Sequence, residues 1–325
     1  MLVVVDDMTL ASKSQSAIDD FIKELSQHYD LRNLGPTSFF LGIEIKRDRP
    51  NHAISLCQRQ YIINMLERFK LTDCNSVLTP MDPGQCLDRS MGATTPDEIN
   101  FMRQTPYLSA VGALMYLAIT TRPDIANAVS ILARFNSNPG PTHWKAVKHL
   151  FRYLKGTIDL KLVYKPVDSP ELFTSYSDAD HGGSKDSGRS TGGYLIKVGT
   201  GAVSWSSKLQ PIVALSTTEA EYIAAVEAGK EIVWMRNILS EFGYAITSPS
   251  TLWIDNQSAI NVAKNPEHHG RMKHMDLRYY WLRDMVEGGI IKPKHVRTEH
   301  MAADILTKPL PRAKVKICRE LMGLE

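Results

Sequence analysis

The segment LFTSYSDAD, residues 172–180, begins the part of the sequence that decides the fold. Its first six residues form a strand-like run, and glycine-rich turns separate it from two similar runs at 193–198 and 202–206. A long helix is expected from Thr217 to Phe242, with Gly243 in the usual position just past its end. The remaining expected elements are a strand at 251–254, helical stretches to about residue 286, a strand near 290–296 and a helix from Met301. This order predicts a mixed α/β sheet flanked by helices.

Four acidic residues stand where these elements would let them converge. Asp178 ends the first strand, Glu221 lies in the first turns of the long helix, Asp255 ends the strand at 251–254, and Asp304 opens the last helix. Carboxylates at strand ends and helix starts can point into one crevice. Crowded carboxylates are stable mainly when cations occupy the site, and oxygen ligands suit Mg²⁺ or Mn²⁺. Taken singly, each residue is as readily explained as a turn former, a cap or a solvated side chain.

Two nearby acids compete with this set. Ser216 and Glu219 fit a capping box, in which Glu219 would reach back to the Ser216 backbone. Glu219 and Glu221 point about 200° apart on a helix, so only one can face the metals, and we assign Glu221 to that role. Alternation along the strand places Asp180 on the same face as Asp178, so Asp180 is a weaker candidate for an assisting role.

Basic and histidine residues near the expected site suggest contacts with nucleic acid. Lys208, Arg271 and Lys273 are suited to phosphate contacts, which fix register without reading sequence. The histidine-rich stretch 268–274 fits a zinc site poorly. His300, and as an alternative His295, lies close to Asp304 in the sequence and is a candidate for an assisting role at the expected site, although an exposed histidine is the more common explanation.

Composition limits the class of protein. A chain of 325 residues predicts two or three compact units. The net charge of +3 is weakly basic and supports nucleic-acid binding only if the charge gathers on one face. The four cysteines lie far apart without a CxxC pair, so we expect free thiols. No apolar run approaches the roughly 20 residues that span a bilayer, so no membrane partner is expected.

The motifs of the last third resemble a known family. SDADHGGSKDSGRSTGGY, SWSSKLQPIVALSTTEAEYIAA, LWIDNQSAI, HHGRMKHMDLRYYWLRD and MAADILTKPL are similar, in this order, to the ribonuclease H domain of copia-type LTR retrotransposon Pol polyproteins. The resemblance implies a ribonuclease H-like fold, with catalytic carboxylates at Asp178, Glu221, Asp255 and Asp304. It also implies two Mg²⁺ or Mn²⁺ ions and hydrolysis of the RNA strand of an RNA–DNA hybrid. His181 stands where the family usually has tryptophan, a change expected to affect packing only.

The earlier part of the chain continues the resemblance. Val4-Val5-Asp6-Asp7, flanked by strand-like residues, is similar to the acidic hairpin of a reverse transcriptase palm, with Val4 in place of the usual tyrosine. LRNLGPTSFFLGIEI, QRQYIINMLERF and LTPM follow in copia-type order. YLSAVGALMYLAITTRPDIANAVSILARF and HWKAVKHLFRYLKGT are similar to the thumb and connection region, with Leu108 in place of arginine.

These resemblances divide the chain into four segments. We expect the end of a palm at 1–80, a linker and helical thumb or connection at 81–170, a ribonuclease H-like domain at 171–312 and a C-terminal tail at 313–325. Two-metal polymerisation needs a third carboxylate and a nucleotide-binding region, so Asp6 and Asp7 are expected to be remnants without polymerase activity in this chain. The expected partners are an RNA–DNA hybrid and the remainder of a Pol polyprotein, in cytoplasmic particles and the nucleus. The alternative is an inactive remnant or a nucleic-acid-binding module without turnover.

Overall fold

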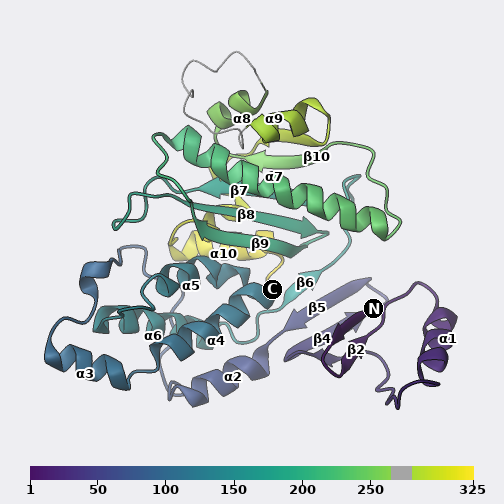
Figure 1. Ribbon diagram of the computed structural model, residues 1–325, viewed down its shortest axis with the longest axis horizontal. Coiled ribbons are helices and arrows are strands. Elements are labelled where there is room, and N and C mark those ends of the chain that lie inside the picture. Colours follow the sequence, from purple (N-terminus) through teal and green to yellow (C-terminus); the bar gives the residue numbers. More distant parts are fainter. Residues whose placement is uncertain (265–279) are drawn as a thin grey trace.

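The computed structural model describes residues 1–264 and 280–325 and contains three sheets (Figure 1). The largest is a five-stranded sheet in the order β11-β10-β7-β8-β9. Its strands are β7 (Thr174–Ala179), β8 (Thr191–Val198), β9 (Gly201–Leu209), β10 (Ser250–Ile254) and β11 (Ile291–His295). β7, β8 and β9 pair antiparallel, whereas β10 pairs parallel with both β7 and β11. The mixed sheet predicted from the sequence is therefore confirmed.

Both faces of this sheet are covered, as the pattern of β8 shows. Leu195 and Ile196 are adjacent and fully buried, yet they belong to two different hydrophobic clusters. Successive side chains of a strand point to opposite faces, so each cluster fills one face of the sheet. The cluster that includes Ile196 contains residues of α7 (Thr217–Glu241), α8 (Gln257–Lys264) and α9 (Tyr280–Glu287). Figure 1 shows α7 lying across the strands on this side.

The opposite face packs against a helical layer formed mainly by earlier residues. Its α-helices are α2 (Arg59–Arg68), α3 (Pro96–Gln104), α4 (Tyr107–Thr120), α5 (Ala126–Ala133) and α6 (Pro141–Gly156), with the 3₁₀ turns η1 (Arg89–Met91) and η2 (Pro123–Ile125). The helical pattern expected at 106–155 is confirmed. The stretch at 72–105, expected as a linker, also contains α3 and buries Met81 and Met102 in the same cluster.

The end of the chain differs from its prediction. The helix expected from Met301 is a pair of short 3₁₀ turns, η5 (Thr298–His300) and η6 (Ala302–Leu306), and the last residues form the helix α10 (Arg312–Met322). Where the sequence suggested a tail from residue 313, Val315, Cys318 and Met322 are buried. Their spacing of three and four residues places them on one face of the helix. This face packs into the hydrophobic cluster that also contains Ile62 and Leu195.

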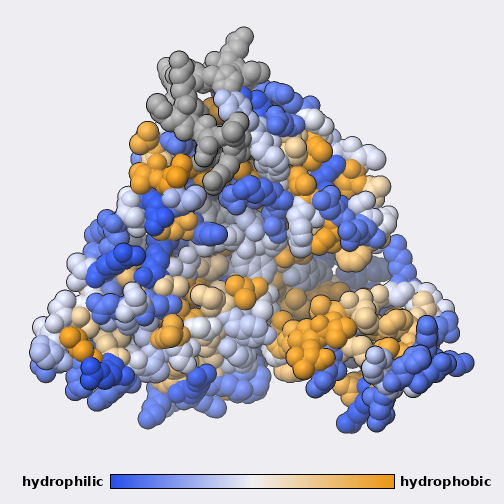
Figure 2. All heavy atoms as spheres, viewed as in Figure 1, coloured by the Kyte–Doolittle hydropathy of each residue, from blue (hydrophilic) through white to orange (hydrophobic). Residues whose placement is uncertain are grey.

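The N-terminal elements form two smaller sheets. β1 (Leu2–Val4) and β2 (Asp7–Thr9) make a hairpin, as expected, and α1 (Gln15–Leu25) follows without any buried residue. β3 (Phe39–Phe40), β4 (Ile43–Asp48) and β5 (Ala53–Cys57) form an antiparallel sheet completed by β6 (Leu162–Tyr164), which lies far away in the sequence. Figure 2 shows apolar side chains gathered on the surface of this region, at the lower right.

Two expectations about chemistry and environment can be compared with the structure. All four cysteines are free, as expected from their spacing. Among the described residues, no helix has the length and apolar character needed to span a bilayer.

Candidate metal centre

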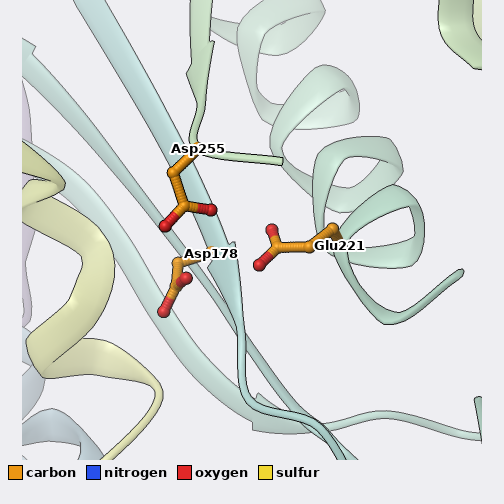
Figure 3. Close-up of side chains that lie close together, drawn as sticks. All are labelled: Asp178, Glu221 and Asp255. Carbon is orange, nitrogen blue, oxygen red and sulfur yellow. The ribbon is translucent and has the colours of Figure 1, made fainter. Parts of the chain in front are cut away.

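Three of the predicted acidic residues meet at one end of the five-stranded sheet (Figure 3). Asp178, Glu221 and Asp255 each offer a carboxylate oxygen, and these oxygens lie within 4.8 Å of one another. The register of the sheet explains two of the three positions. Ser177 of β7 pairs with Ile254 of β10, so the next residue on each parallel strand, Asp178 within β7 and Asp255 just past the end of β10, lies at the same end of the sheet. Parallel strands bring residues together in this way whatever their distance in sequence.

Glu221 reaches the same point from α7. The helix α7 packs on β7 and β8. Tyr222, the residue that follows Glu221, is buried in the hydrophobic cluster that includes Ile196. Glu221 is 6% exposed and accepts a hydrogen bond from the backbone N–H of Ala179. Its Oε2 atom is buried and has no hydrogen-bond partner. A buried carboxylate oxygen without a partner is costly unless a cation binds it.

Burial and mutual repulsion change the acidity of these groups. Burial raises the pKa of Glu221 to about 10, with further contributions from Asp178 and Asp255. Burial also raises the pKa of Asp178 to about 6, opposed by the positive charge of Lys308. In the absence of a cation, Glu221 therefore holds a proton at neutral pH, and a divalent ion would replace that proton. The donor set consists only of oxygens and fits Mg²⁺ or Mn²⁺.

Asp304 is buried next to this group but is paired with lysines. It is 1% exposed and comes from η6, which packs against β7 and β8. Lys308 Nζ lies 2.7 Å from Asp304 Oδ1 and 3.5 Å from Asp178 Oδ2, while Lys314 Nζ lies 3.0 Å from Asp304 Oδ2. Asp304 is therefore joined to Asp178 through the ammonium group of Lys308.

Two hydroxyl groups orient the carboxylates. Thr307 Oγ1 donates a hydrogen bond to Asp178 Oδ2, and Thr298 Oγ1 donates one to Asp255 Oδ2 at 3.0 Å. Sequence reasoning missed both threonines and both lysines. For Thr307 and Lys308 the available signal was the spacing within MAADILTKPL, because residues three and four positions after Asp304 return to its side in a turn or helix. Thr298 and Lys314 lie outside this motif, and local spacing does not indicate them.

Comparison with known proteins identifies the family. Residues 1–83 match the family model described as reverse transcriptase (RNA-dependent DNA polymerase). The chain is 43% identical over 324 residues to the retrovirus-related Pol polyprotein from transposon TNT 1-94 of Nicotiana tabacum, which covers 100% of this chain and 24% of that polyprotein. It is 35% identical over 231 residues to a putative transposon Ty5-1 protein of Saccharomyces cerevisiae, covering 71% of this chain and 72% of that protein. The chain belongs to the copia-type retrotransposon Pol family.

The family membership inferred from the motifs is thus confirmed. The Pol chain contains a reverse transcriptase region and a mixed five-stranded sheet, and it spans about a quarter of the length of the tobacco polyprotein. Among solved structures, it is similar to the LC11 ribonuclease H1 crystallised with an RNA/DNA hybrid. The sequence identity is 15% and the TM-score 0.29, and the match covers 42% of this chain and 93% of that chain.

The competing acids of the Pol chain lie outside the three-carboxylate group. Glu219 serves the start of α7, as expected, although its Oε2 accepts from the N–H of Leu215 at 2.8 Å and not from Ser216. Ser216 Oγ accepts from the N–H of Glu219, which completes the cap. Asp180 accepts a hydrogen bond from the backbone N–H of Thr191. The carboxylate of Asp180 thus closes the loop between β7 and β8, and no described contact joins it to Asp178.

The remaining candidates are dispersed. Lys208 is exposed on β9, the strand at one edge of the five-stranded sheet. His300 is exposed, with its Nε2 atom 3.8 Å from Glu299 Oε1, and His295 is exposed at the end of β11. Asp6 and Asp7 are exposed at the β1–β2 turn. Arg271, Lys273 and the stretch 268–274 lie outside the described residues.

Proposed function

We propose that this Pol chain is a divalent-metal-dependent ribonuclease that cleaves the RNA strand of RNA–DNA hybrids. The observation that carries the proposal is the group formed by the buried Asp178 and Glu221 and the half-buried Asp255, in which Glu221 Oε2 has no hydrogen-bond partner. An unpartnered acidic oxygen among other carboxylates, in a chain of the retrotransposon Pol family, is better explained by metal binding than by structural need.

The acidic residues and the two threonines would have different roles in the proposed metal centre. Asp178, Glu221 and Asp255 would hold a divalent ion, and Asp304 would complete the acidic set. Bound divalent ions supply an activated water and stabilise the leaving oxygen of phosphodiester cleavage. Thr307 and Thr298 would keep Asp178 and Asp255 oriented for this task, since hydrogen-bonded neighbours fix the geometry of metal ligands.

The substrate would be held by positive charge outside the carboxylate group. Lys208 is exposed and free to contact a phosphate, and Arg271 and Lys273 are proposed for the same role from the sequence. We propose no polymerase activity for the chain alone, with Asp6 and Asp7 not forming a working polymerase site. The second candidate is a nucleic-acid-binding module without turnover.

The test is cleavage of an end-labelled RNA–DNA hybrid by the full chain with Mg²⁺ or Mn²⁺. Asp255→Asn and Glu221→Gln should each reduce the cleavage rate by about a hundredfold or more, because each removes a charged ligand of the ion. Glu219→Gln is the control on the same helix, since Glu219 serves the N-terminal cap of α7 and not the carboxylate group. This variant should retain at least half the activity. Binding without cleavage in the unaltered chain would favour the module, and primer extension would overturn the polymerase assignment.

A further inference from the structure

Lys308 stands between two of the acidic side chains of the candidate metal centre. Its Nζ atom is 2.7 Å from Asp304 Oδ1 and 3.5 Å from Asp178 Oδ2. The contact with Asp304 is a short ion pair, and the one with Asp178 is longer. A compact ammonium charge between two carboxylates occupies the kind of position that a bridging cation takes.

The neighbouring lysine is held differently. Lys314 comes from α10, its side chain is 17% exposed, and its Nζ atom contacts both Asp304 and the backbone oxygen of Thr298. The side chain of Lys308 is 39% exposed, and within the described part of the chain its ion pairs are with the two carboxylates. Lys314 is thus fixed in the structure, whereas Lys308 can leave toward solvent on its flexible stem.

The charges near the centre balance with a single divalent ion. With Asp178, Glu221, Asp255 and Asp304 all deprotonated, the two lysines leave two negative charges in this buried region. One divalent ion among Asp178, Glu221 and Asp255 neutralises them. A second ion beside Asp304 would meet the charge of Lys308 at short range, which strongly opposes its binding.

We propose that Lys308 holds the place of the second cation, so that the chain binds one divalent ion tightly and a second ion only by displacing this lysine. The proposal rests on the metal-dependent function proposed above and specifies how the second position is controlled. Lys308 is in this sense a positioning residue. It keeps Asp304 and Asp178 together in the absence of the second ion.

The experiment is a titration of the full chain with Mn²⁺ in the absence of nucleic acid, with free Mn²⁺ followed by electron paramagnetic resonance. The unaltered chain should bind one Mn²⁺ tightly. In Lys308→Met the affinity for a second Mn²⁺ should be at least about tenfold higher than in the unaltered chain, because a competing positive charge is gone. Lys316→Met is the matched control on α10, since Lys316 pairs with Glu320 at the surface, and it should behave as the unaltered chain.

The outcomes separate this inference from the proposed function. Two equally tight ions in the unaltered chain, or no gain in Lys308→Met, would overturn the role of Lys308 and leave the metal-dependent function standing. No Mn²⁺ binding in the unaltered chain would overturn both. Glu221→Gln should lose the first ion.

A second measurement needs no substitution and so does not depend on a variant that folds. Acetylation of lysines in the unaltered chain, read by mass spectrometry, should leave Lys308 protected at one equivalent of Mn²⁺. Lys308 should be modified several times faster at saturating Mn²⁺, when the second ion displaces it. Equal reactivity at both concentrations would contradict displacement.

Discussion

At the scale of one residue, the burial of Glu221 changes its acidity. An exposed glutamate on a helix would be ionised at neutral pH and would affect stability little. Here the side chain is buried beside two aspartates, and burial first, then the neighbouring charges, raises its pKa to about 10. In the proposed metal centre, a cation bound to Glu221 would offset the cost of burying its charged form and the repulsion from the two aspartates, as the proton does in its absence.

This acidity predicts how the stability of the metal-free chain depends on pH. The pKa of Glu221 is raised from 4.5 to about 10 on folding, so its protonated form stabilises the fold fully below pH 4.5 and this contribution is lost as the pH rises through 10. Between pH 6 and 9 in EDTA, the free energy of unfolding should fall more steeply with pH in the unaltered chain than in Glu221→Gln, by at most about 1.4 kcal/mol per pH unit. Urea denaturation at several pH values measures this.

The test compares how steeply the free energy of unfolding falls with pH in the unaltered chain and in Glu221→Gln. The glutamine of Glu221→Gln cannot titrate, so the stability curve of this variant reports every other ionisable group and is the reference for the unaltered chain. Parallel stability curves for the two proteins would mean that Glu221 is not protonated in the folded state. Saturating Mg²⁺ should flatten the curve of the unaltered chain, since the ion replaces the proton.

At the scale of elements, the contact between β8 and η6 positions the last acidic residue. Gly193 of β8 pairs with Asp178 of β7, and a Cβ atom at Gly193 would lie 2.8 Å from the Cβ of Leu306 and 3.0 Å from the Cγ2 of Thr307. The absence of a side chain therefore lets η6 approach the strand closely. This approach places Thr307 against Asp178 and brings Asp304 near the other carboxylates.

Gly193→Ala should accordingly displace η6. We expect a loss of stability of about 1 to 3 kcal/mol from overpacking, together with weaker Mn²⁺ binding, because Thr307 moves away from Asp178. Gly192→Ala is the matched control. A Cβ there would meet Gln210 at 3.4 Å and Ala224 at 3.5 Å, which are ordinary contacts. Thermal unfolding and Mn²⁺ titration compare the two variants, and equal behaviour would show that η6 does not depend on this glycine.

At the scale of the whole molecule, one hydrophobic cluster links distant parts of the chain. It includes Ile62 of α2, Leu195 of β8, and Met322 of α10. An isolated bridge joins Leu162 to Leu324, so the last residues extend the contact to β6. The elements that position Asp304 and Lys314 therefore depend on packing that involves both the early helices and the C-terminal helix.

This linkage predicts that the end of the chain is important for stability. Met322→Ala, at a fully buried position, should lower the free energy of unfolding by about 2 to 5 kcal/mol. Ile317→Ala on the same helix is the control, since Ile317 is 40% exposed and should cost about 0.5 kcal/mol or less. Urea denaturation followed by circular dichroism measures both. A small effect of Met322→Ala would mean that α10 behaves as a tail after all.

Between residues 172 and 296, the sequence by itself determined the order of the elements and the positions of the acidic residues along them. Strand runs, the long helix ended by Gly243 and the placement of Asp178, Glu221 and Asp255 follow from local periodicity and turn residues, which act within a few positions of the chain. The motifs also indicated the retrotransposon family.

Only the tertiary structure decided which of these acids lie within reach of one another and which are paired with lysines. The pairing of Asp304 with Lys308 and Lys314, the docking of α10 and the addition of β6 to the N-terminal sheet depend on contacts between segments far apart in sequence. Such contacts are set by sheet register and by the volume left between packed layers. Neither quantity can be read from local periodicity.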